Sequence, residues 1–558
     1  MINKLLKSFI LYFNTLKYLS LNQIILRLRN IIRLNFIKYF PNQYFSYIRK
    51  NLDYNVNKNF FFKTYHFKNN NDYRDLLNLR FNFLNQKYSF NQNIDWKDEV
   101  FFNNNILWKY NLNYHNFLLD IIDNDPSKEK IDFIEKIISS WIKDNDFSKH
   151  NFDNDNWNSY VISNRVLSWI KVYAYYKGSF SKNFEFIFIK SLRFQLEFLS
   201  KNIEYHLRGN HLLENAFALY CGAYFFNNRN LFNQSLDIIL KELDCQILND
   251  GAHNELSPMY HQHILTRILD CYQISKENNL FDKKLNNINW KEYISLMLDW
   301  IEKVTFDNDD LPLVNDCSEY IYPKTSEIAK YALYLGFQSK EKKDIVLNDS
   351  GYRKRENDLY EFFCDIGKMG PDYNPGHAHN DTFSFTMHIS QKPFFVDTGT
   401  STYNFSERRI KERSTSSHNT VLINSQEQSE VWGNFRVGKR INPKILLDES
   451  NIIEAQYQSV FNKSIHNRKF LFKENEVTIK DKVNKQYINE SHLHFHPSVE
   501  INKKENIIET EFATIRLLEF DKILLEDYYY AESFNILRKG KKLRMFFKNT
   551  SSINIILK

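Results

Sequence analysis

Residues 374–389 read NPGHAHNDTFSFTMHI, and they mark the point at which the apolar pattern of the chain becomes that of a β-strand. A Pro-Gly pair near the start of the stretch indicates a turn. From Phe383 to Ile389, apolar residues then alternate with polar ones, as they do in a strand with one buried face. The parts of the chain before and after this point therefore need separate interpretations.

Three groups that can carry chemistry, His377, His379 and Asp381, lie between this turn and the strand. Residues two apart in an extended chain point the same way, so the three side chains can share one face. A loop–strand junction is also a place from which a fold aims side chains into a cleft. Two interpretations stay open on this evidence: a metal or catalytic cluster, and polar residues on a solvated strand edge.

The chain from about Tyr114 to Leu335 has the apolar period of helices, with spacings of three and four. Short polar links between successive helices predict antiparallel neighbours, in a helical array or a closed toroid of hairpins. After a helix around residues 131–141, the predicted helices are residues 157–176, 183–200, 212–226, 231–248, 259–274 and 290–304.

Strand patterns dominate after residue 346, at residues 383–389, 393–396, 419–423, 476–483 and 493–495. A run of helices followed by a run of strands predicts a multidomain α+β protein. We expect an N-terminal helical or irregular segment at residues 1–90. An (α/α) toroid of helical hairpins should follow at residues 91–345, and a C-terminal antiparallel β-sandwich at residues 346–558.

Composition narrows the class of protein. With 558 residues, 43% hydrophobic and 16% aromatic, the chain has ample material for buried cores and is not disordered. The net charge of +7 permits a basic cleft for an acidic ligand, and no Lys/Arg run is long enough to predict nucleic-acid binding. Five scattered cysteines without a CxxC pair predict buried free thiols.

The first forty residues are basic and apolar. Lys4 and Lys7 precede a short apolar run at residues 9–13, as at the start of a signal peptide. The run is too short to span a membrane, and no small-residue cleavage site follows it. Residues 21–40 continue as a basic amphipathic pattern, which fits a helix on the protein body and a helix on a membrane surface equally well. No transmembrane segment is predicted.

Two motifs in the helical half carry candidate catalytic groups. Residues 208–215, RGNHLLEN, place Asn210 at an N-cap position, with His211 and Glu214 on one helical face. Ordinary capping is the alternative. Residues 251–261, GAHNELSPMYH, form a loop that delivers Tyr260 to the next helix, where half-buried packing is the alternative.

Further motifs offer binding groups. In residues 157–165, WNSYVISNR, the aromatic and Arg side chains can line a sugar cleft, or the segment is a core helix with a snorkelling Arg. In the β part, Asp397 follows a strand, and His418 and Arg436 belong to later polar stretches. Imidazoles and carboxylates of this kind can assemble a zinc site, although their spacing alone does not identify one.

Six of these stretches together resemble the heparinase II/III family of polysaccharide lyases. Their order and number over about residues 157–438 make the match specific, whereas the first 90 residues carry little of it. The resemblance implies an N-terminal (α/α) toroid, a C-terminal antiparallel β-sandwich and β-elimination at a uronic acid within an acidic polysaccharide. The stretches are GNHLLEN (209–215), SPMYH (257–261), GHAHND (376–381), VDTGT (396–400), RSTSSHNT (413–420) and WGNFRVG (432–438).

The resemblance also implies roles for individual residues. Tyr260 is implied as the acid, and as the base for one epimer of the uronic acid. His211 is implied as the base for the other epimer or as a positioning group, with Glu214 orienting it. Asn210 and His377 are implied to neutralise the sugar carboxylate. The residues expected on the substrate side are Trp157, Tyr160, Arg165, Glu214 and Arg436.

In relatives with a structural zinc ion, the ligands map onto His379, Asp397 and His418, which would free His377 to face the helical cleft. The resemblance implies no organic cofactor. It also implies a location in the cell envelope or periplasm, with a cytoplasmic or membrane-surface location as the alternative. The oligomeric state is not predicted.

Rival functions stay open at this point. A glycoside hydrolase would use two carboxylates, for which Glu214, Glu255 and Asp381 are candidates. A non-catalytic glycan-binding or exopolysaccharide-biosynthesis protein of the same fold is an alternative of a different class. A di-metal hydrolase is disfavoured, because Thr382 stands where such motifs usually carry another histidine.

Overall fold

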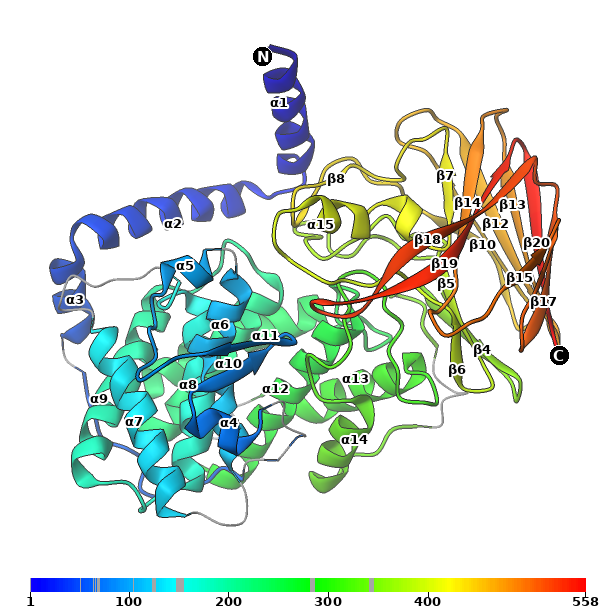
Figure 1. The fold of residues 1–558 in the computed structure, drawn as a ribbon. Helices are drawn as coiled ribbons and strands as arrows, with labels where there is room; N and C mark the ends of the chain where they lie inside the picture. The colour runs from blue at the N-terminus through cyan, green and yellow to red at the C-terminus, as the bar shows by residue number, and fades with distance from the viewer. Residues whose placement is uncertain are drawn as a thin grey trace.

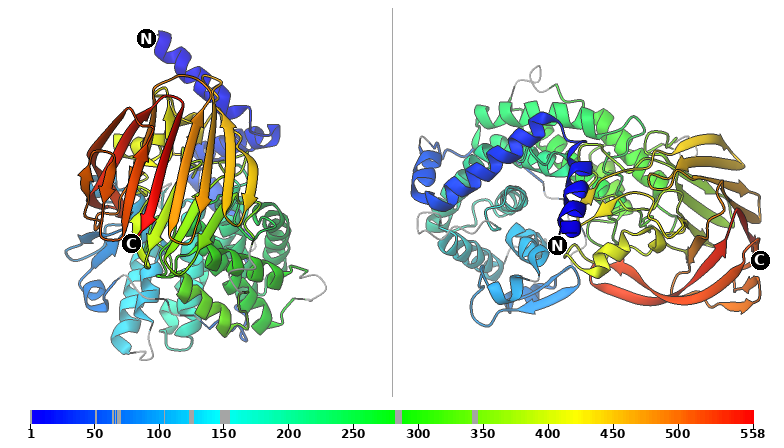
Figure 2. Two further views of the ribbon diagram at one scale, coloured as in Figure 1. Left: turned by 90° about the vertical axis from the view of Figure 1, so that its right-hand side faces the viewer. Right: turned by 90° about the horizontal axis from the view of Figure 1, so that it is seen from above.

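The computed structural model describes residues 2–50, 52–63, 65, 67, 71–103, 105–122, 127–146, 155–281, 287–340 and 346–558. A helical N-terminal half is followed by a sheet-rich C-terminal half, which confirms the predicted α+β architecture (Figure 1). Seen from above, the helices follow a curved, ring-like path on one side of the molecule, and the sheets stand on the other (Figure 2).

The helices of the ring match the predicted segments closely. α10 lies at its centre, because it packs against α8, α9, α11 and α12 and nearly all of its side chains are buried. Antiparallel hairpins of this kind follow from short polar links. The bounds are α6 (Ile106–Tyr114), η1 (Asn116–Ile121), α7 (Lys128–Asp144), α8 (Ser159–Tyr175), α9 (Lys182–Lys201), α10 (Gly209–Phe226), α11 (Arg229–Gln246), α12 (Pro258–Asn278), α13 (Trp290–Val304) and α14 (Thr325–Tyr334).

The N-terminal segment is more regular than expected. Helix α2 crosses the rim of the ring, and α1 projects away from it (Figure 1). A short hairpin of strands β1 and β2 was not predicted. It forms where Leu84 and Asn85 adopt positive φ and turn the chain between the two strands. The bounds are α1 (Ile2–Leu16), α2 (Leu21–Tyr39), α3 (Pro41–Arg49), α4 (Tyr73–Leu77), β1 (Arg80–Phe83), β2 (Gln86–Ser89) and α5 (Glu99–Phe102).

The C-terminal half is an antiparallel β-sandwich. Its eight-stranded sheet has the order β10-β11-β12-β13-β20-β17-β16-β15, and two four-stranded sheets have the orders β18-β19-β14-β7 and β3-β4-β5-β6. One apolar cluster joins the three sheets, with members such as Phe385, Ile479 and Leu493. This cluster is the core that the alternating strand pattern predicts.

The strand bounds of the sandwich are β3 (Tyr352–Glu356), β4 (Tyr360–Asp365), β5 (Phe385–Ile389), β6 (Lys392–Phe395), β7 (Val421–Ile423), β10 (Lys444–Glu449), β11 (Ile452–Gln458), β12 (Ile465–Phe472), β13 (Glu476–Val483), β14 (Asn489–His494), β15 (Asn502–Lys504), β16 (Ile507–Glu509), β17 (Ala513–Leu518), β18 (Lys522–Ser533), β19 (Ile536–Phe547) and β20 (Thr550–Leu557). Strands β8 (Val431–Trp432) and β9 (Arg436–Val437) pair separately, and the short helices α15 (Glu407–Glu412) and η4 (Thr415–Ser417) precede β7.

The expected strand over residues 383–389 begins two residues late. Phe383 has a positive φ of 66° and its amide donates to the Asp365 carbonyl, so the chain turns here before β5 starts at Phe385. The residues from His377 to Asp381 are consequently loop, and their side chains are placed by that loop rather than by a strand face.

Arg468 of β12 anchors this loop from inside the sandwich. Its guanidinium donates to both carboxylate oxygens of Asp481, at 2.7 and 2.8 Å, and to the carbonyls of Phe383 and Asn419 at 2.8 and 2.6 Å. The charges of both partners are buried. One buried ion pair therefore connects strands β12 and β13 to the two loops that carry His379 and His418.

Replacing this arginine by a neutral side chain tests that role. We expect Arg468→Met to lower the free energy of unfolding by about 3–5 kcal/mol, because the buried Asp481 carboxylate would lose its cation and keep only the His466 imidazole as a side-chain partner. Denaturant unfolding followed by circular dichroism measures the change.

The matched control is Lys469→Met on the same strand, where the ion pair with Glu454 is partly exposed. Its loss should cost about 1 kcal/mol or less. Equal effects of the two substitutions would contradict the anchoring role of Arg468.

Candidate active site

A cavity of about 1260 Å³ lies where the helical half, the sandwich and the N-terminal helices meet. Its wall includes side chains from α6, α8, α10 and α12, from the loop around Tyr322, and from two loops of the sandwich. Four predicted catalytic residues, Asn210, His211, Tyr260 and His377, all line it. Residues from both halves of the sequence thus reach one volume.

Asn210 is held at the start of α10 by Glu255. The Asn210 amide Nδ2 donates to Glu255 Oε2 at 2.7 Å, and its backbone N donates to Oε1 at 3.0 Å. Gly209 permits this approach: it has a positive φ of 58°, and a Cβ there would lie 2.2 Å from Glu255 Oε1. Because a side-chain amide has two hydrogens on nitrogen, Asn210 retains one donor for a ligand.

His211 contacts Glu204, not Glu214. Its Nδ1 lies 3.3 Å from Glu204 Oε1, and its ring lies 4.5 Å from that of Tyr160, centroid to centroid. Burial disfavours the imidazolium, but nearby carboxylates, Glu204 first among them, raise the pKa of His211 above its ordinary value.

The expectation that Glu214 orients His211 is wrong. The Glu214 carboxylate is fully buried and lies 2.8 Å from Arg267 Nη2 and 3.1 Å from His263 Nε2. Spacing along α10 correctly places His211 and Glu214 on one side of the helix, but two stronger partners from α12 take the carboxylate.

Tyr260 and His377 meet across the junction of the two halves. Their rings lie 4.2 Å apart, centroid to centroid, and the Tyr260 hydroxyl lies 3.1 Å from the Tyr403 hydroxyl. Burial, and after it the neighbouring Tyr403, raises the pKa of Tyr260 well above its ordinary value. The Tyr260 hydroxyl is therefore protonated at neutral pH.

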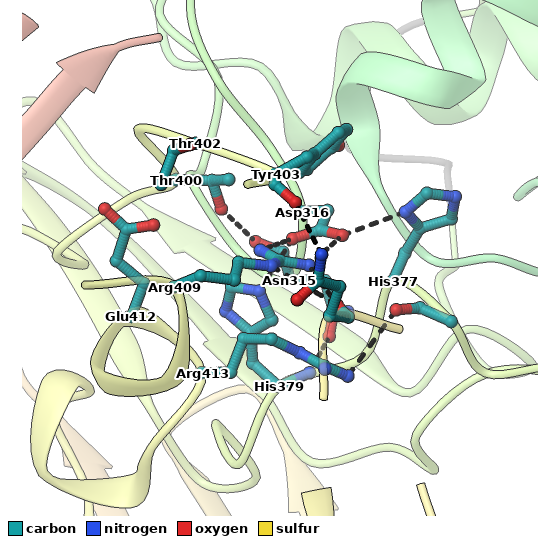
Figure 3. A network of polar contacts seen from close by, with 12 residues as sticks. Asn315, Asp316, His377, His379, Thr400, Thr402, Tyr403, Arg409, Glu412 and Arg413 are labelled. Atoms are coloured by element: carbon teal, nitrogen blue, oxygen red, sulfur yellow. Dashed lines mark hydrogen bonds and ion pairs between the residues drawn. The ribbon is translucent and has the colours of Figure 1, made fainter. Parts of the chain in front are cut away.

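Asp316 is the centre of the polar network behind the cavity (Figure 3). Its two carboxylate oxygens lie 2.9 Å from His377 Nδ1 and 2.9 Å from His379 Nε2. Arg409 of α15 approaches both oxygens, with Nη2 2.7 Å from Oδ2. Burial alone would favour the neutral acid, but Arg409 and the two histidines hold the pKa of Asp316 well below its ordinary value.

The substrate-side predictions divide into two groups. Tyr160 and Arg436 line the cavity. Trp157 and Arg165 lie in the core instead: the Arg165 guanidinium is fully buried, lies 3.9 Å from the Trp141 ring and donates to Gln195. We therefore assign Trp157, Arg165 and Glu214 to the packing of the helices rather than to sugar contacts.

The three expected zinc ligands lie close together, but His418 contacts Asp397 directly and His379 contacts Asp316. His418 Nδ1 lies 2.7 Å from Asp397 Oδ2, and the His379 and His418 rings lie 5.5 Å apart. His379 Nδ1 and His418 Nε2 are buried and have no hydrogen-bond partner among the described residues. No group of three or more His, Cys, Asp or Glu side chains in the described part of the chain is arranged to hold a metal ion.

His379, Asp397 and His418 are thus residue types that bind zinc, but their side chains are not arranged around one common point as in a zinc site. Zinc binds imidazole nitrogens and carboxylates. The lone pairs of the two unpartnered nitrogens, His379 Nδ1 and His418 Nε2, could bind such an ion. The direct contact between His418 and Asp397 would have to open for both to bind one ion.

Several residues of the site were not found from the sequence. Asp316, Tyr403 and Glu204 contact the catalytic groups, and Arg409 contacts Asp316. Glu255 was considered only as a glycosidase carboxylate. Arg409 stands just before the RSTSSHNT motif, which is a weak signal. Asp316 lies in the connection between the two halves, where no motif marks it.

Comparison with known proteins finds relatives of similar sequence and solved structures of similar fold. Heparin-sulfate lyases from Pedobacter heparinus and Bacteroides stercoris are each 25% identical to it, over 317 and 308 residues. These alignments cover 52% and 46% of this chain and 47% and 45% of the relatives, so the chain spans about half the length of the curated relatives it matches.

The fold extends further than the sequence similarity. A crystal structure of heparinase III superposes with a TM-score of 0.70 at 18% identity, covering 95% of this chain and 91% of that one. The family model for the heparinase II/III N-terminus matches residues 62–343, and that for the heparinase II/III-like C-terminal domain matches residues 339–528. The two models together account for most of the chain, which belongs to the heparinase II/III family.

Proposed function

We propose that the protein is a polysaccharide lyase that cleaves an acidic, uronic-acid-containing glycan by β-elimination. The observation that carries the proposal is the convergence of Asn210, His211, Tyr260 and His377 on one cavity. The heparin-sulfate lyases among its relatives support the same class of substrate.

The reaction needs the sugar carboxylate to be neutralised first. The C5 proton of a uronic acid lies next to a carboxylate and is barely acidic until hydrogen bonds stabilise the enolate-like charge. The free amide hydrogen of Asn210 can supply one of these bonds. His377 can supply another from Nε2 when its ring carries both protons, because its Nδ1–H already donates to Asp316. Glu255 fixes the amide of Asn210, and Asp316 fixes the ring of His377 through Nδ1.

Proton transfer then falls to Tyr260 and His211. A protonated Tyr260 hydroxyl can donate to the departing glycosidic oxygen as the C5 proton is removed. Transfers of this kind contribute on the order of 10² to 10⁴ in rate. His211, when neutral, can remove the C5 proton of the epimer whose proton faces it. For the other epimer, Tyr260 would act as a phenolate, which takes the C5 proton and passes it on to the departing glycosidic oxygen.

The rival glycoside hydrolase has less support. Such enzymes need two carboxyl groups on opposite sides of the scissile bond. Of the three candidates, Glu214 and Asp381 are buried away from the cavity, and Glu255 is occupied by Asn210.

We also propose a cell-envelope location, where an acidic polymer is encountered. Within the described ranges, none of the helices combines the length and apolar character needed to cross a membrane.

Tyr260→Phe tests the acid. We expect kcat to fall by about 10² to 10⁴-fold while the Kd for the polymer changes little, because only the hydroxyl is removed. Formation of the unsaturated uronate, followed by ultraviolet absorbance on a panel of uronic-acid polymers, measures kcat, and calorimetry measures binding.

Tyr403→Phe is the control, since it removes the neighbouring hydroxyl and leaves that of Tyr260 in place. Its effect should be much smaller. Unchanged turnover in Tyr260→Phe would refute the assignment of the acid, and cleavage without a new double bond in the native protein would favour the hydrolase.

The raised pKa of His211 predicts a pH profile. Only the neutral imidazole accepts a proton, so kcat/KM on the epimer served by His211 should rise with pH through that pKa. Glu204→Gln removes the nearest charge that raises the pKa, and the rise should therefore move to lower pH. Glu197→Gln on α9 is the control and should leave the profile in place. A profile unmoved by Glu204→Gln would exclude His211 as the base.

A structural zinc ion held by His379, Asp397 and His418 is a further part of this proposal. It rests on the two unpartnered imidazole nitrogens. The ion would fix the loop that bears His377 and would take no part in the proton transfers.

Metal analysis of the purified protein by mass spectrometry should find about one zinc per chain. His418→Ala should lose it, and the control His496→Ala should keep it. Native protein purified without chelators and still free of metal would contradict the zinc proposal and leave the lyase proposal untouched.

A further inference from the structure

Helix α2 is amphipathic in the opposite sense to an ordinary surface helix. Apart from the buried Ile37, its polar side faces the protein: Gln23 is buried, Asn30 contacts His206 at 3.2 Å, and Arg33 donates to the Lys201 carbonyl at 3.1 Å. Arg27, on the same side, lines the cavity. A surface helix normally turns its apolar side to the core.

The apolar side of α2 points to solvent. We call Leu21, Ile25, Leu28 and Ile32 the outer stripe; their spacings of four, three and four keep them on one helical face. These side chains are 73%, 53%, 57% and 70% exposed. Phe9 and Phe13 of α1 are also largely exposed, on the helix that projects beyond both halves of the molecule (Figures 1 and 2).

The charge of this segment has one sign. Seven basic residues lie within residues 1–40, and no aspartate or glutamate precedes Asp53. Arg29 and Lys38 of α2 are exposed beside the outer stripe. A contiguous exposed apolar surface marks an interaction site, and its basic flanks are complementary to a negatively charged partner.

We propose that α1 and α2 dock on an anionic membrane surface, with the outer stripe in the region between headgroups and acyl chains. Basic amphipathic helices bind membranes in this way, through buried apolar area together with attraction to anionic lipids. A second copy of the chain suits the surface less well, because two such segments would bring like charges together.

The test is co-sedimentation of the full chain with vesicles. We expect binding to phosphatidylcholine vesicles that contain phosphatidylglycerol, weakening as salt is raised, and much weaker binding to phosphatidylcholine alone. The variant Ile25→Glu with Leu28→Glu and Ile32→Glu should bind at least tenfold more weakly. None of these three residues lines the cavity, so its turnover of a soluble polymer should equal that of the native chain.

A matched control carries three glutamates at comparably exposed apolar positions elsewhere: Phe186→Glu, Leu333→Glu and Ile488→Glu. It should bind vesicles as the native chain does. The proposal is overturned if the native protein does not co-sediment with the anionic vesicles, or if both triple variants lose binding equally. Light scattering that shows a native dimer, dissociated by the outer-stripe variant, together with no vesicle binding, would assign the surface to self-association instead.

Discussion

The site depends on one buried carboxylate, that of Asp316. Burying an ion costs several kcal/mol unless its partners satisfy it, and Asp316 is satisfied by Arg409, His377 and His379 at once. The neighbouring Asn315 extends the network: its side-chain oxygen accepts from the backbone N–H of His379, and its backbone N–H donates to the Asp381 carboxylate. The chain connecting the two halves thus fixes both histidines of the HAHND motif (Figure 3).

This arrangement makes the cavity a property of the junction and of neither half alone. Asn210, His211 and Tyr260 come from helices, whereas His377 and Tyr403 come from loops of the sandwich. The two histidines of the HAHND motif therefore have different surroundings: His377 reaches the cavity, and His379 lies fully buried near His418.

Local pattern predicted the helices, most strands and four cavity residues, because periodicity and short motifs are contained in neighbouring residues. Local pattern could not predict which side chains contact each other when they lie far apart in the sequence. The spacing along the helix predicted that Glu214 contacts His211, but its carboxylate binds Arg267 and His263, about fifty residues away. Arg165 is a second example: its buried guanidinium lies over the Trp141 ring, and no feature of the neighbouring sequence predicts this contact. Asp316 was missed because its partners lie 61 to 93 residues further along the chain.

The N-terminal helices connect the same two halves from the outside. Asn14 donates to Glu430 and Thr15 accepts from Trp432 on the sandwich, while α2 contacts His206 and Lys201 of the helical ring. Tyr12 and Arg27 meanwhile line the cavity. A membrane that binds the outer stripe would therefore act on a strap that touches both sides of the junction. Such binding would hold the strap in place and, with it, the distance between the halves on which the pairing of Tyr260 and His377 depends.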